Sequence, residues 1–134
     1  KLVRGFEGEK YDLIQQYVSA LPDISSKINI NTAPALVLAA IDPKLDVAQV
    51  ATLQKQKLEK MENFNNVHDL LGADLFKSIE PANKAIAEKV FDVKSNYFKA
   101  EIDVALNNRN RQMSSYLMRK NNKVTVYVRS LAPF

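Results

Sequence analysis

The chain has 134 residues, of which 46% are hydrophobic and 25% charged, and it contains no cysteine. This composition supports a packed core, in one domain or two small ones, and argues against disorder. No run approaches the roughly 18–20 apolar residues of a membrane span, and no signal peptide opens the chain. The net charge is −1 over residues 1–94, with 12 Lys/Arg and 13 Asp/Glu, and +5 over residues 95–134, with 7 and 2.

The first 94 residues predict a series of short helices. The first helix ends at Pro22, and its apolar face comprises Leu13, Ile14, Tyr17, Val18 and Leu21. Further helices are expected at about 33–41, from 47 to 61 with Asp46 as its cap, at 67–71 and at 82–90. The chain begins at Lys1, without an initiator Met, almost directly in a helical pattern. We therefore expect it to be part of a longer protein whose targeting or anchoring segment lies upstream.

An asparagine-rich run, Lys27-Ile28-Asn29-Ile30-Asn31-Thr32-Ala33-Pro34, separates the first two predicted helices. Its alternation of Ile and Asn predicts a short strand. Asn31 or Thr32 is expected to cap the helix that follows, with Pro34 in its first turn. We predict that the side chains of this run bond backbone groups around that helix start.

From Tyr97 onward the hydrophobic period becomes two, which predicts strands. Three antiparallel strands are expected at about 97–106, 111–119 and 124–129, with turns at Asn107-Asn108 and Asn121-Asn122. One buried face is predicted to hold Phe98, Ile102, Val104, Val124, Val126 and Val128. The predicted fold class is thus α+β: a helical, helix-hairpin-helix-like unit over residues 1–94, then a three-stranded antiparallel sheet over residues 95–134.

Residues that could carry chemistry are few. His68 is the only histidine, so a histidine-based metal site or catalytic dyad has no partner. The serine pairs at 25–26 and 114–115 lack the glycines of a nucleophile elbow. The carboxylates Glu59, Glu62, Asp69 and Asp74 are interpreted as a solvated face, and no calcium loop is present. The sequence therefore predicts no catalytic, cofactor-binding or metal-binding residue, and no enzyme.

A basic run near the C-terminus comprises Arg109, Arg111, Arg119, Lys120 and Lys123. These side chains could face an acidic partner or lipid headgroups. The interpretation that we favour is a solvated outer face of the sheet, where Lys and Arg also protect edge strands from aggregation.

The asparagine-rich run resembles a segment found in two settings: helix-hairpin-helix modules that hold nucleic-acid phosphates, and the helical insert of the type II secretion minor pseudopilin K. The turn Ile41–Asp46 argues against the first. It has no glycine, loses one N–H at Pro43 and places two carboxylates where phosphate would bind. The helical part is also slightly acidic, which opposes nucleic-acid binding. A nucleic-acid-binding module stays the alternative function.

The resemblance to pseudopilin K extends over nearly the whole chain. Its motifs are Leu21-Pro22, Glu62-Asn63-Phe64, Val67-His68-Asp69-Leu70-Leu71, Ser95-Asn96-Tyr97-Phe98, Arg119 and Val126–Arg129. What the chain lacks of that family is the N-terminal apolar helix and the first strands of the pilin-like sheet.

The resemblance implies a structural subunit at the tip of the secretion pseudopilus, which acts by contact in the export of folded proteins across the outer membrane. The implied partners are the minor pseudopilins I and J, with the exoprotein or the outer-membrane channel as further candidates. The implied location is the periplasm, anchored in the bacterial inner membrane through a helix absent from this chain. Calcium is a cofactor that the resemblance allows, but the sequence places no ligands for it.

A three-stranded sheet with one apolar face is marginal unless something covers that face. In a pilin-like subunit the long N-terminal helix would do so. Within this chain, the segment Ala82–Val93 offers apolar side chains for only part of the area. We therefore expect the strands to be less stable alone than the helical unit, and to contact segments or subunits outside this chain.

Overall fold

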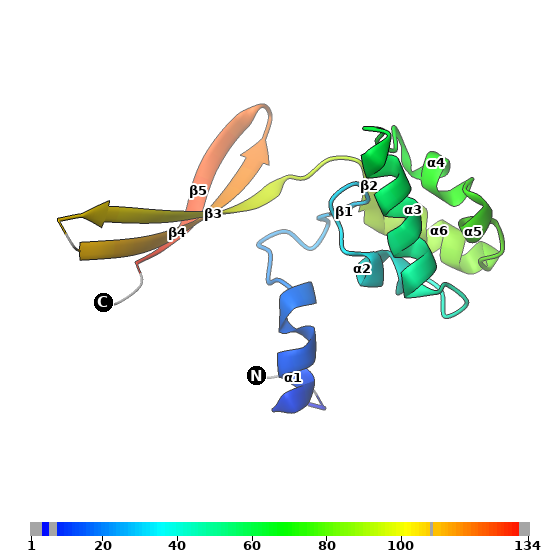
Figure 1. Ribbon diagram of the computed structural model, residues 1–134, viewed down its shortest axis with the longest axis horizontal. Helices are drawn as coiled ribbons and strands as arrows, with labels where there is room; N and C mark the ends of the chain where they lie inside the picture. Colours follow the sequence, from blue (N-terminus) through cyan, green and yellow to red (C-terminus); the bar gives the residue numbers. More distant parts are fainter. Residues whose placement is uncertain (1–3, 6–7, 108, 132–134) are drawn as a thin grey trace. The chain divides into compact units, whose positions relative to one another are not determined.

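The computed structural model describes residues 4–5, 8–107 and 109–131. The chain divides into two compact units, residues 1–94 and residues 95–134. The first consists mainly of helices and the second is a three-stranded antiparallel sheet (Figure 1). The predicted α+β fold class is confirmed.

The helical unit contains six α-helices and one 3-10 helix among its described residues. They are α1 (Glu9–Ile14), η1 (Gln15–Tyr17), α2 (Ala35–Ala39), α3 (Val47–Glu59), α4 (Val67–Leu71), α5 (Asp74–Lys77) and α6 (Pro81–Val90). The first predicted helix is shorter than expected and buries no residue. The short helix α5 was not predicted, because four residues are too few for a helical period to show in the sequence.

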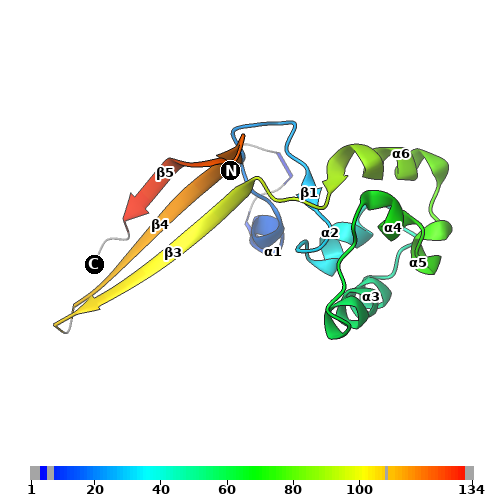
Figure 2. The same cartoon turned by 90° about the horizontal axis from the view of Figure 1, so that it is seen from above.

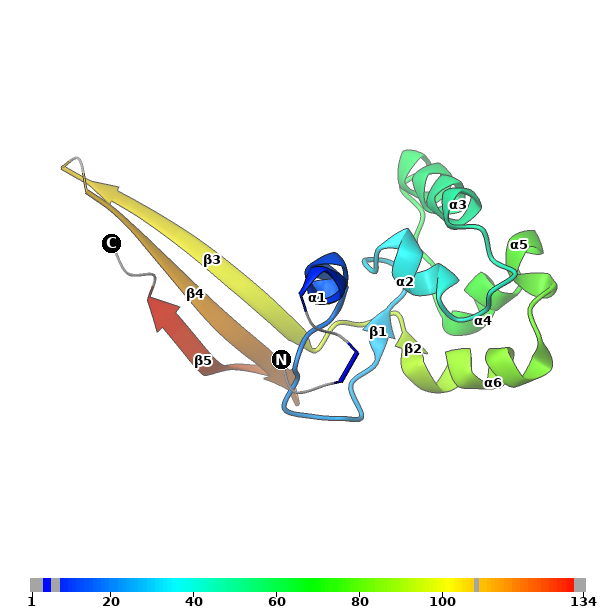
Figure 3. The ribbon, with the colours of Figure 1, turned by 90° about the horizontal axis from the view of Figure 1, so that it is seen from below.

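The core of the helical unit draws side chains from α2 to α6 and from residues in or next to β1 and β2. Its largest fully buried apolar side chains are Ile30, Leu38, Val50, Leu70, Phe76 and Phe91. In Figure 3, α2 lies beside α3, and α4 and α5 lie near α6. A two-residue parallel pair, β1 (Ile28–Asn29) with β2 (Phe91–Asp92), joins the segment before α2 to the segment after α6. The sequence predicted a strand at β1 but not its partner 63 positions later.

Asn31 connects two segments of the helical unit instead of capping α2. Its Nδ2 donates to the carbonyl of Phe64 (3.0 Å), and its Oδ1 accepts from the N–H of Phe64 (2.8 Å). The N-cap position of α2 is Pro34, and no side chain caps this helix. The expectation that Asn31 or Thr32 caps α2 is therefore wrong, because the turn that begins at Asn29 moves the helix start beyond both residues.

Asp42 is the one charged side chain in the core of the described structure, with 1% of its surface exposed. Its Oδ1 accepts from the N–H of Lys44 (2.9 Å). Its Oδ2 accepts from the N–H of Glu80 (3.0 Å) and from the side-chain amide of Asn83 (2.9 Å). The carboxylate therefore joins the turn between α2 and α3 to the start of α6. At the end of this turn Asp46 caps α3 by accepting from the N–H of Gln49 (2.9 Å), as predicted.

The sheet has the order β3-β4-β5, with β3 (Tyr97–Leu106), β4 (Arg109–Lys120) and β5 (Lys123–Leu131). The two longer strands, β3 and β4, form a long antiparallel pair, and β5 lies along part of β4 (Figure 2). Asn121 and Asn122 have φ values of 50° and 60°, which confirms the predicted asparagine turn. Of the other predicted turn, Asn107 has a φ of 47° and Asn108 lies outside the described residues.

The register of the sheet confirms part of the predicted apolar face and corrects the rest. Phe98 lies opposite Leu117, which lies opposite Val126, so these side chains share one face. At the next residue β5 has a bulge, and Val128 lies opposite Tyr116, outside that set. A bulge inserts one residue and shifts the alternation, which a strict period of two cannot show.

The predicted burial of this face is wrong for the described structure. Phe98, Ile102 and Val126 are 41%, 40% and 45% exposed.

The Asn31 connection predicts a specific loss of stability. In Asn31→Ala, the N–H and the carbonyl of Phe64 both lose their partner, so we expect the free energy of unfolding to fall by about 2 kcal/mol. Thr32→Ala is the control, because the Thr32 hydroxyl reaches only the Asn29 carbonyl at 3.5 Å. Urea unfolding followed by circular dichroism measures both. Equal losses in the two variants would contradict the role given to Asn31.

The Asp42 contacts predict a characteristic dependence of stability on pH. Hydrogen bonds from Asn83, Glu80 and Lys44 lower the pKa of Asp42 from 3.8 to about 2. Because the folded-state pKa lies below the unfolded value, this stabilisation is complete above the unfolded value and is lost as pH falls toward the folded one. Asp42→Asn should therefore lower the melting temperature by several degrees at neutral pH, and the difference from wild type should shrink between pH 4 and pH 2.

Asp74→Asn provides the matched control for this measurement, since the Asp74 side chain is 97% exposed and pairs only with Lys77 on its own helix. We expect little change in its melting temperature. A difference between Asp42→Asn and wild type that did not vary with pH would contradict the account.

Candidate functional site

The turn between α2 and α3 is built in a way that opposes phosphate binding. The N–H groups of Lys44 and Leu45, which a phosphate would need, donate to the side chain and the carbonyl of Asp42. Pro43 has no N–H to offer. An incoming phosphate would have to displace a buried carboxylate from its donors, so the geometry argues against the helix-hairpin-helix function.

The structure does not gather the titratable groups of the helices into a catalytic centre. His68 is exposed, and its Nδ1 lies 3.7 Å from a carboxylate oxygen of Glu88 on α6. Asp69, its neighbour in sequence, instead accepts from the N–H of Asn65 at the start of α4 (2.9 Å). The other carboxylates of the predicted solvated face form ion pairs on their own segments: Lys55 with Glu59, Lys57 with Glu62 and Lys77 with Asp74.

The serines also have structural roles. Ser25 donates its hydroxyl to a carboxylate oxygen of Asp23 (2.6 Å), and Ser26 donates to the carbonyl of the same residue (2.8 Å). Ser114 and Ser115 are successive residues of β4, so they point to opposite faces of the sheet, and Ser115 is buried. Within the described part of the chain, no group of three or more His, Cys, Asp or Glu side chains is arranged to hold a metal ion.

One face of the sheet presents exposed apolar side chains along all three strands. We call it the apolar face. By register it comprises Phe98, Ala100, Ile102 and Val104 of β3, the odd-numbered residues Arg111 to Arg119 of β4, and Val124, Val126, Arg129 and Leu131 of β5. Most of its large apolar side chains are between 40% and 67% exposed. An apolar area of this kind is typical of a surface that another segment covers.

Arginines, and no acidic residues, accompany the apolar side chains on this face. Arg111 lies opposite Val104, and Arg129 lies opposite Ser115. The guanidinium of Arg119 stacks over the ring of Phe98 at 5.6 Å from its centroid, and it donates to the carbonyl of Ser95 (2.7 Å). The acidic residues of the sheet, Glu101 and Asp103, point to the other face. The arginines of the basic run are exposed, as the favoured interpretation of a solvated face requires, but they share their face with the apolar side chains and do not lie on the other one.

The opposite face carries an aromatic cluster. The ring centroids of Tyr97 and Tyr127 lie 6.0 Å apart in an edge-to-face arrangement, and those of Tyr116 and Tyr127 lie 6.3 Å apart. Lys99 lies over the ring of Tyr116 and pairs with Glu101. Hydrogen bonding to Glu101 is the main cause of the raised pKa of Lys99. This face is polar and internally paired, so the two faces of the sheet have different chemistry.

The sequence contained a signal for the face on which the arginines lie. It is the alternation of residues along β4, counted back from the asparagine turn at residues 121–122. Residues that pair across an antiparallel turn share a face, so odd positions of β4 match even positions of β3 and β5 up to the bulge. The sequence analysis treated the basic residues as one run and did not assign them to faces. No helix among the described residues is long and apolar enough to cross a membrane.

Comparisons with known proteins identify the family of this chain. Residues 28–94, half of the sequence, match the family model of protein K of the type II secretion system. The fold is similar to that of a chain in the crystal structure of the GspK-GspI-GspJ complex from the type 2 secretion system of enterotoxigenic Escherichia coli, with a TM-score of 0.74 and 21% sequence identity. That alignment covers 99% of this chain and 46% of the other, so this chain spans about half the length of the structure that it matches. No curated protein matches the sequence.

The matched segment, residues 28–94, begins at β1 and ends directly after β2, so it contains both strands that join the ends of the helical unit. The order of helices and strands agrees with the resemblance described from the sequence. The chain belongs to the family of protein K of the type II secretion system, a pseudopilin family.

Proposed function

We propose that this chain is the helical part and the returning strands of a minor pseudopilin that assembles at the tip of the secretion pseudopilus. Its partners in this proposal are the minor pseudopilins I and J. The full-length protein is anchored in the bacterial inner membrane by a segment outside this chain and works in the periplasm. Its role is structural, because it helps to start the fibre that exports folded proteins across the outer membrane.

The observation that carries the proposal is the exposed apolar face of the sheet. Phe98, Ile102 and Val126 are each at least 40% exposed, although they lie on paired strands. Burying such a surface contributes roughly 25 cal/mol for each Å² removed from water, which is the main term available to hold a second segment there. Exposed apolar areas of this kind mark surfaces that another segment or subunit covers.

The charges on the same face define what can cover it. A segment packed there brings its side chains next to Arg129, while the face itself offers no carboxylate. A covering helix is therefore favoured when carboxylates flank its apolar stripe. On the other face Glu101 already pairs with Lys99, so that face does not favour a covering helix with carboxylates.

Further support comes from the family and the fold. The family model covers residues 28–94 of the helical unit, and the similar solved chain was crystallised in a complex whose name includes GspI and GspJ. The turn between α2 and α3 opposes the alternative function of nucleic-acid binding, as described above. The proposal includes export substrates and contacts with the outer-membrane channel on the basis of the family alone.

Hydrogen exchange tests the proposal on the chain as it stands. In the isolated chain, we expect the amides of β3, β4 and β5 to exchange faster than those of α3 and α6. With the I and J pseudopilins of the same genome at about ten times the dissociation constant, protection of the strand amides should rise about tenfold. Strand amides as protected as the helical core, and unchanged by I and J, would contradict the proposal.

A further inference from the structure

The backbone of β3 has an open edge. Among the described residues the strand order is β3-β4-β5, so β4 pairs with one edge of β3 and no strand pairs with the other. The N–H of Arg119 donates to the carbonyl of Asn96 (2.7 Å), and the same register continues along both strands. The even-numbered residues of β3 therefore bond β4, while the odd-numbered residues from Tyr97 to Asp103 direct their N–H and C=O groups away from it.

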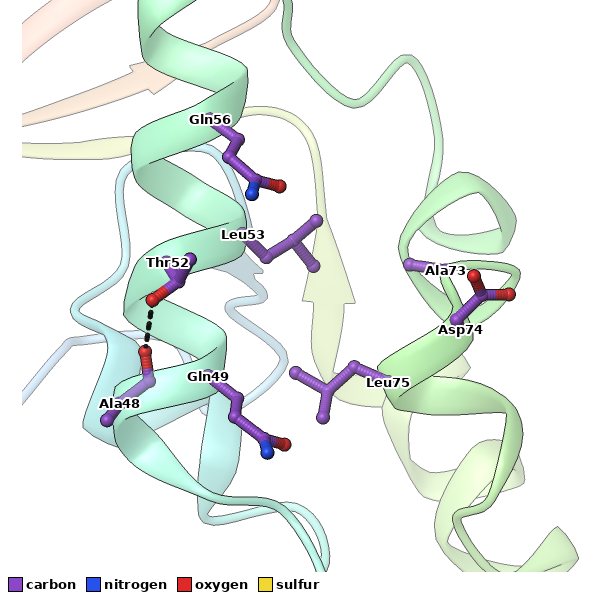
Figure 4. Close-up of a pocket in the computed structure, with 8 residues that line it drawn as sticks. All are labelled: Ala48, Gln49, Thr52, Leu53, Gln56, Ala73, Asp74 and Leu75. Atoms are coloured by element: carbon purple, nitrogen blue, oxygen red, sulfur yellow. Dashed lines mark hydrogen bonds between the residues drawn. The ribbon is translucent and has the colours of Figure 1, made fainter.

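These unpaired backbone groups distinguish the edge of β3 from the helices. In the interior of a helix the N–H and C=O groups bond each other. In the groove between α3 and α5, even the hydroxyl of Thr52 donates to a backbone carbonyl, that of Ala48 (2.9 Å; Figure 4). The edge of β3 is instead a place where a further strand can add backbone hydrogen bonds.

The two edges of the sheet differ in how they are protected against such pairing. Along β5 the register shifts at a bulge, and Lys123 and Arg129 place charges of one sign on either side of its apolar residues. Bulges and like charges both hinder the addition of a strand. The ten residues of β3 pair with β4 without a shift, include no proline or glycine, and carry charges of both signs. The edge of β3 thus admits a strand of matching charge.

The sequence of β3 is complementary to itself in one antiparallel register. When two copies of β3 are paired about Ala100, Lys99 of each copy lies opposite Glu101 of the other. Both are outward-directed residues, so their backbone groups bond each other, and opposite charges across an antiparallel pair are stabilising.

The neighbouring registers are less favourable. A shift by one residue sets outward-directed backbone groups against groups that already bond β4. A shift by two residues places either Lys99 opposite Lys99 or Glu101 opposite Glu101, which is destabilising. Charge and backbone geometry therefore select the register that is centred on Ala100.

The same register continues the apolar face across the contact. Phe98 of one copy lies opposite Ile102 of the other, and the two copies of Ala100 lie side by side. Phe98 and Ile102 are 41% and 40% exposed in the single chain, so both have surface available for this contact. Pairs of an aromatic and a β-branched side chain across strands add to the stability of a sheet.

We propose that the open edge of β3 pairs with β3 of a second copy of this chain, antiparallel, about a two-fold axis at Ala100. The two sheets join into one, and the side chains of Lys99 and Glu101 from both copies alternate in charge on its polar face. The contact uses backbone groups at the edge of the sheet and does not rest on the assembly with I and J.

Disulfide trapping tests the register. The chain contains no cysteine, so Ala100→Cys introduces a single thiol. The Cα atoms of a non-hydrogen-bonded antiparallel pair lie about 4.5 Å apart, a distance that a disulfide spans. We expect mild oxidation to link two chains of this variant. Val104→Cys is the matched control, because this residue lies on the same face and is 54% exposed, yet its two copies would be about 27 Å apart along the strands.

Charge reversal tests the affinity of the contact. Lys99→Glu sets carboxylates against each other twice, so we expect about tenfold weaker dimerisation. Lys99→Glu combined with Glu101→Lys restores opposite charges and should restore the affinity of the wild type. Lys123→Glu, at the edge of β5, is the control and should change little. Sedimentation equilibrium between about 10 µM and 1 mM measures the dimer, and circular dichroism shows whether each variant is folded.

Three outcomes would overturn the inference. A chain that is monomeric at every concentration leaves the edge of β3 to a strand from another segment. Equal cross-linking of Ala100→Cys and Val104→Cys shows that no defined register exists. Failure of the combined Lys99 and Glu101 exchange to restore dimerisation shows that the charges do not select the partner. None of them bears on the protection that I and J give to the strands of the monomer, so the two proposals fail separately.

Discussion

The carboxylate of Asp42 holds together segments that lie about 40 residues apart in the sequence. It accepts from Lys44 within its own turn, and from Glu80 and Asn83 where α6 begins. Because the group is buried, losing a donor leaves its charge less compensated, so the position of the turn and the position of α6 depend on each other.

The sheet differs from the helical unit, because its main apolar surface is exposed to solvent. In the helical unit Ile30, Phe76 and Phe91 are almost completely buried, whereas Phe98 of the sheet is 41% exposed. The first unit thus has a core of its own, whereas the second leaves its apolar face exposed. The fold as a whole matches about half of a longer chain.

Local patterns in the sequence predicted the elements whose signals are local. The cap at Asp46, the asparagine turn at residues 121–122 and the three strands were all visible, because each depends on neighbouring residues or on alternation. Contacts between distant segments were not visible. The bonds between Asn31 and Phe64, and the pairing of β1 with β2, join residues more than 30 positions apart. An asparagine such as Asn31 would also fit a helix cap, and the residues of β1 would also fit a strand without a partner in this chain.

Predictions about the functional sites show the same difference between local signals and contacts between distant segments. The argument against phosphate at the turn followed from the absence of glycine and the presence of Asp42, and the structure supplies the geometry that explains it. The bulge at Tyr127 could not be predicted, since it depends on how β5 pairs with β4, and it removed Val128 from the expected face.

The central claim is that the apolar face of the sheet is a packing surface in the assembled protein. Site-specific photo-cross-linking in the full-length protein tests it most directly, with the cross-linker placed at Val126 on the apolar face or at Thr125 on the opposite face of the same strand. The account predicts strong cross-linking from position 126 to the segment or subunit that covers the apolar face, and much weaker cross-linking to it from position 125. Equal yields from the two positions, or none from position 126, would contradict it.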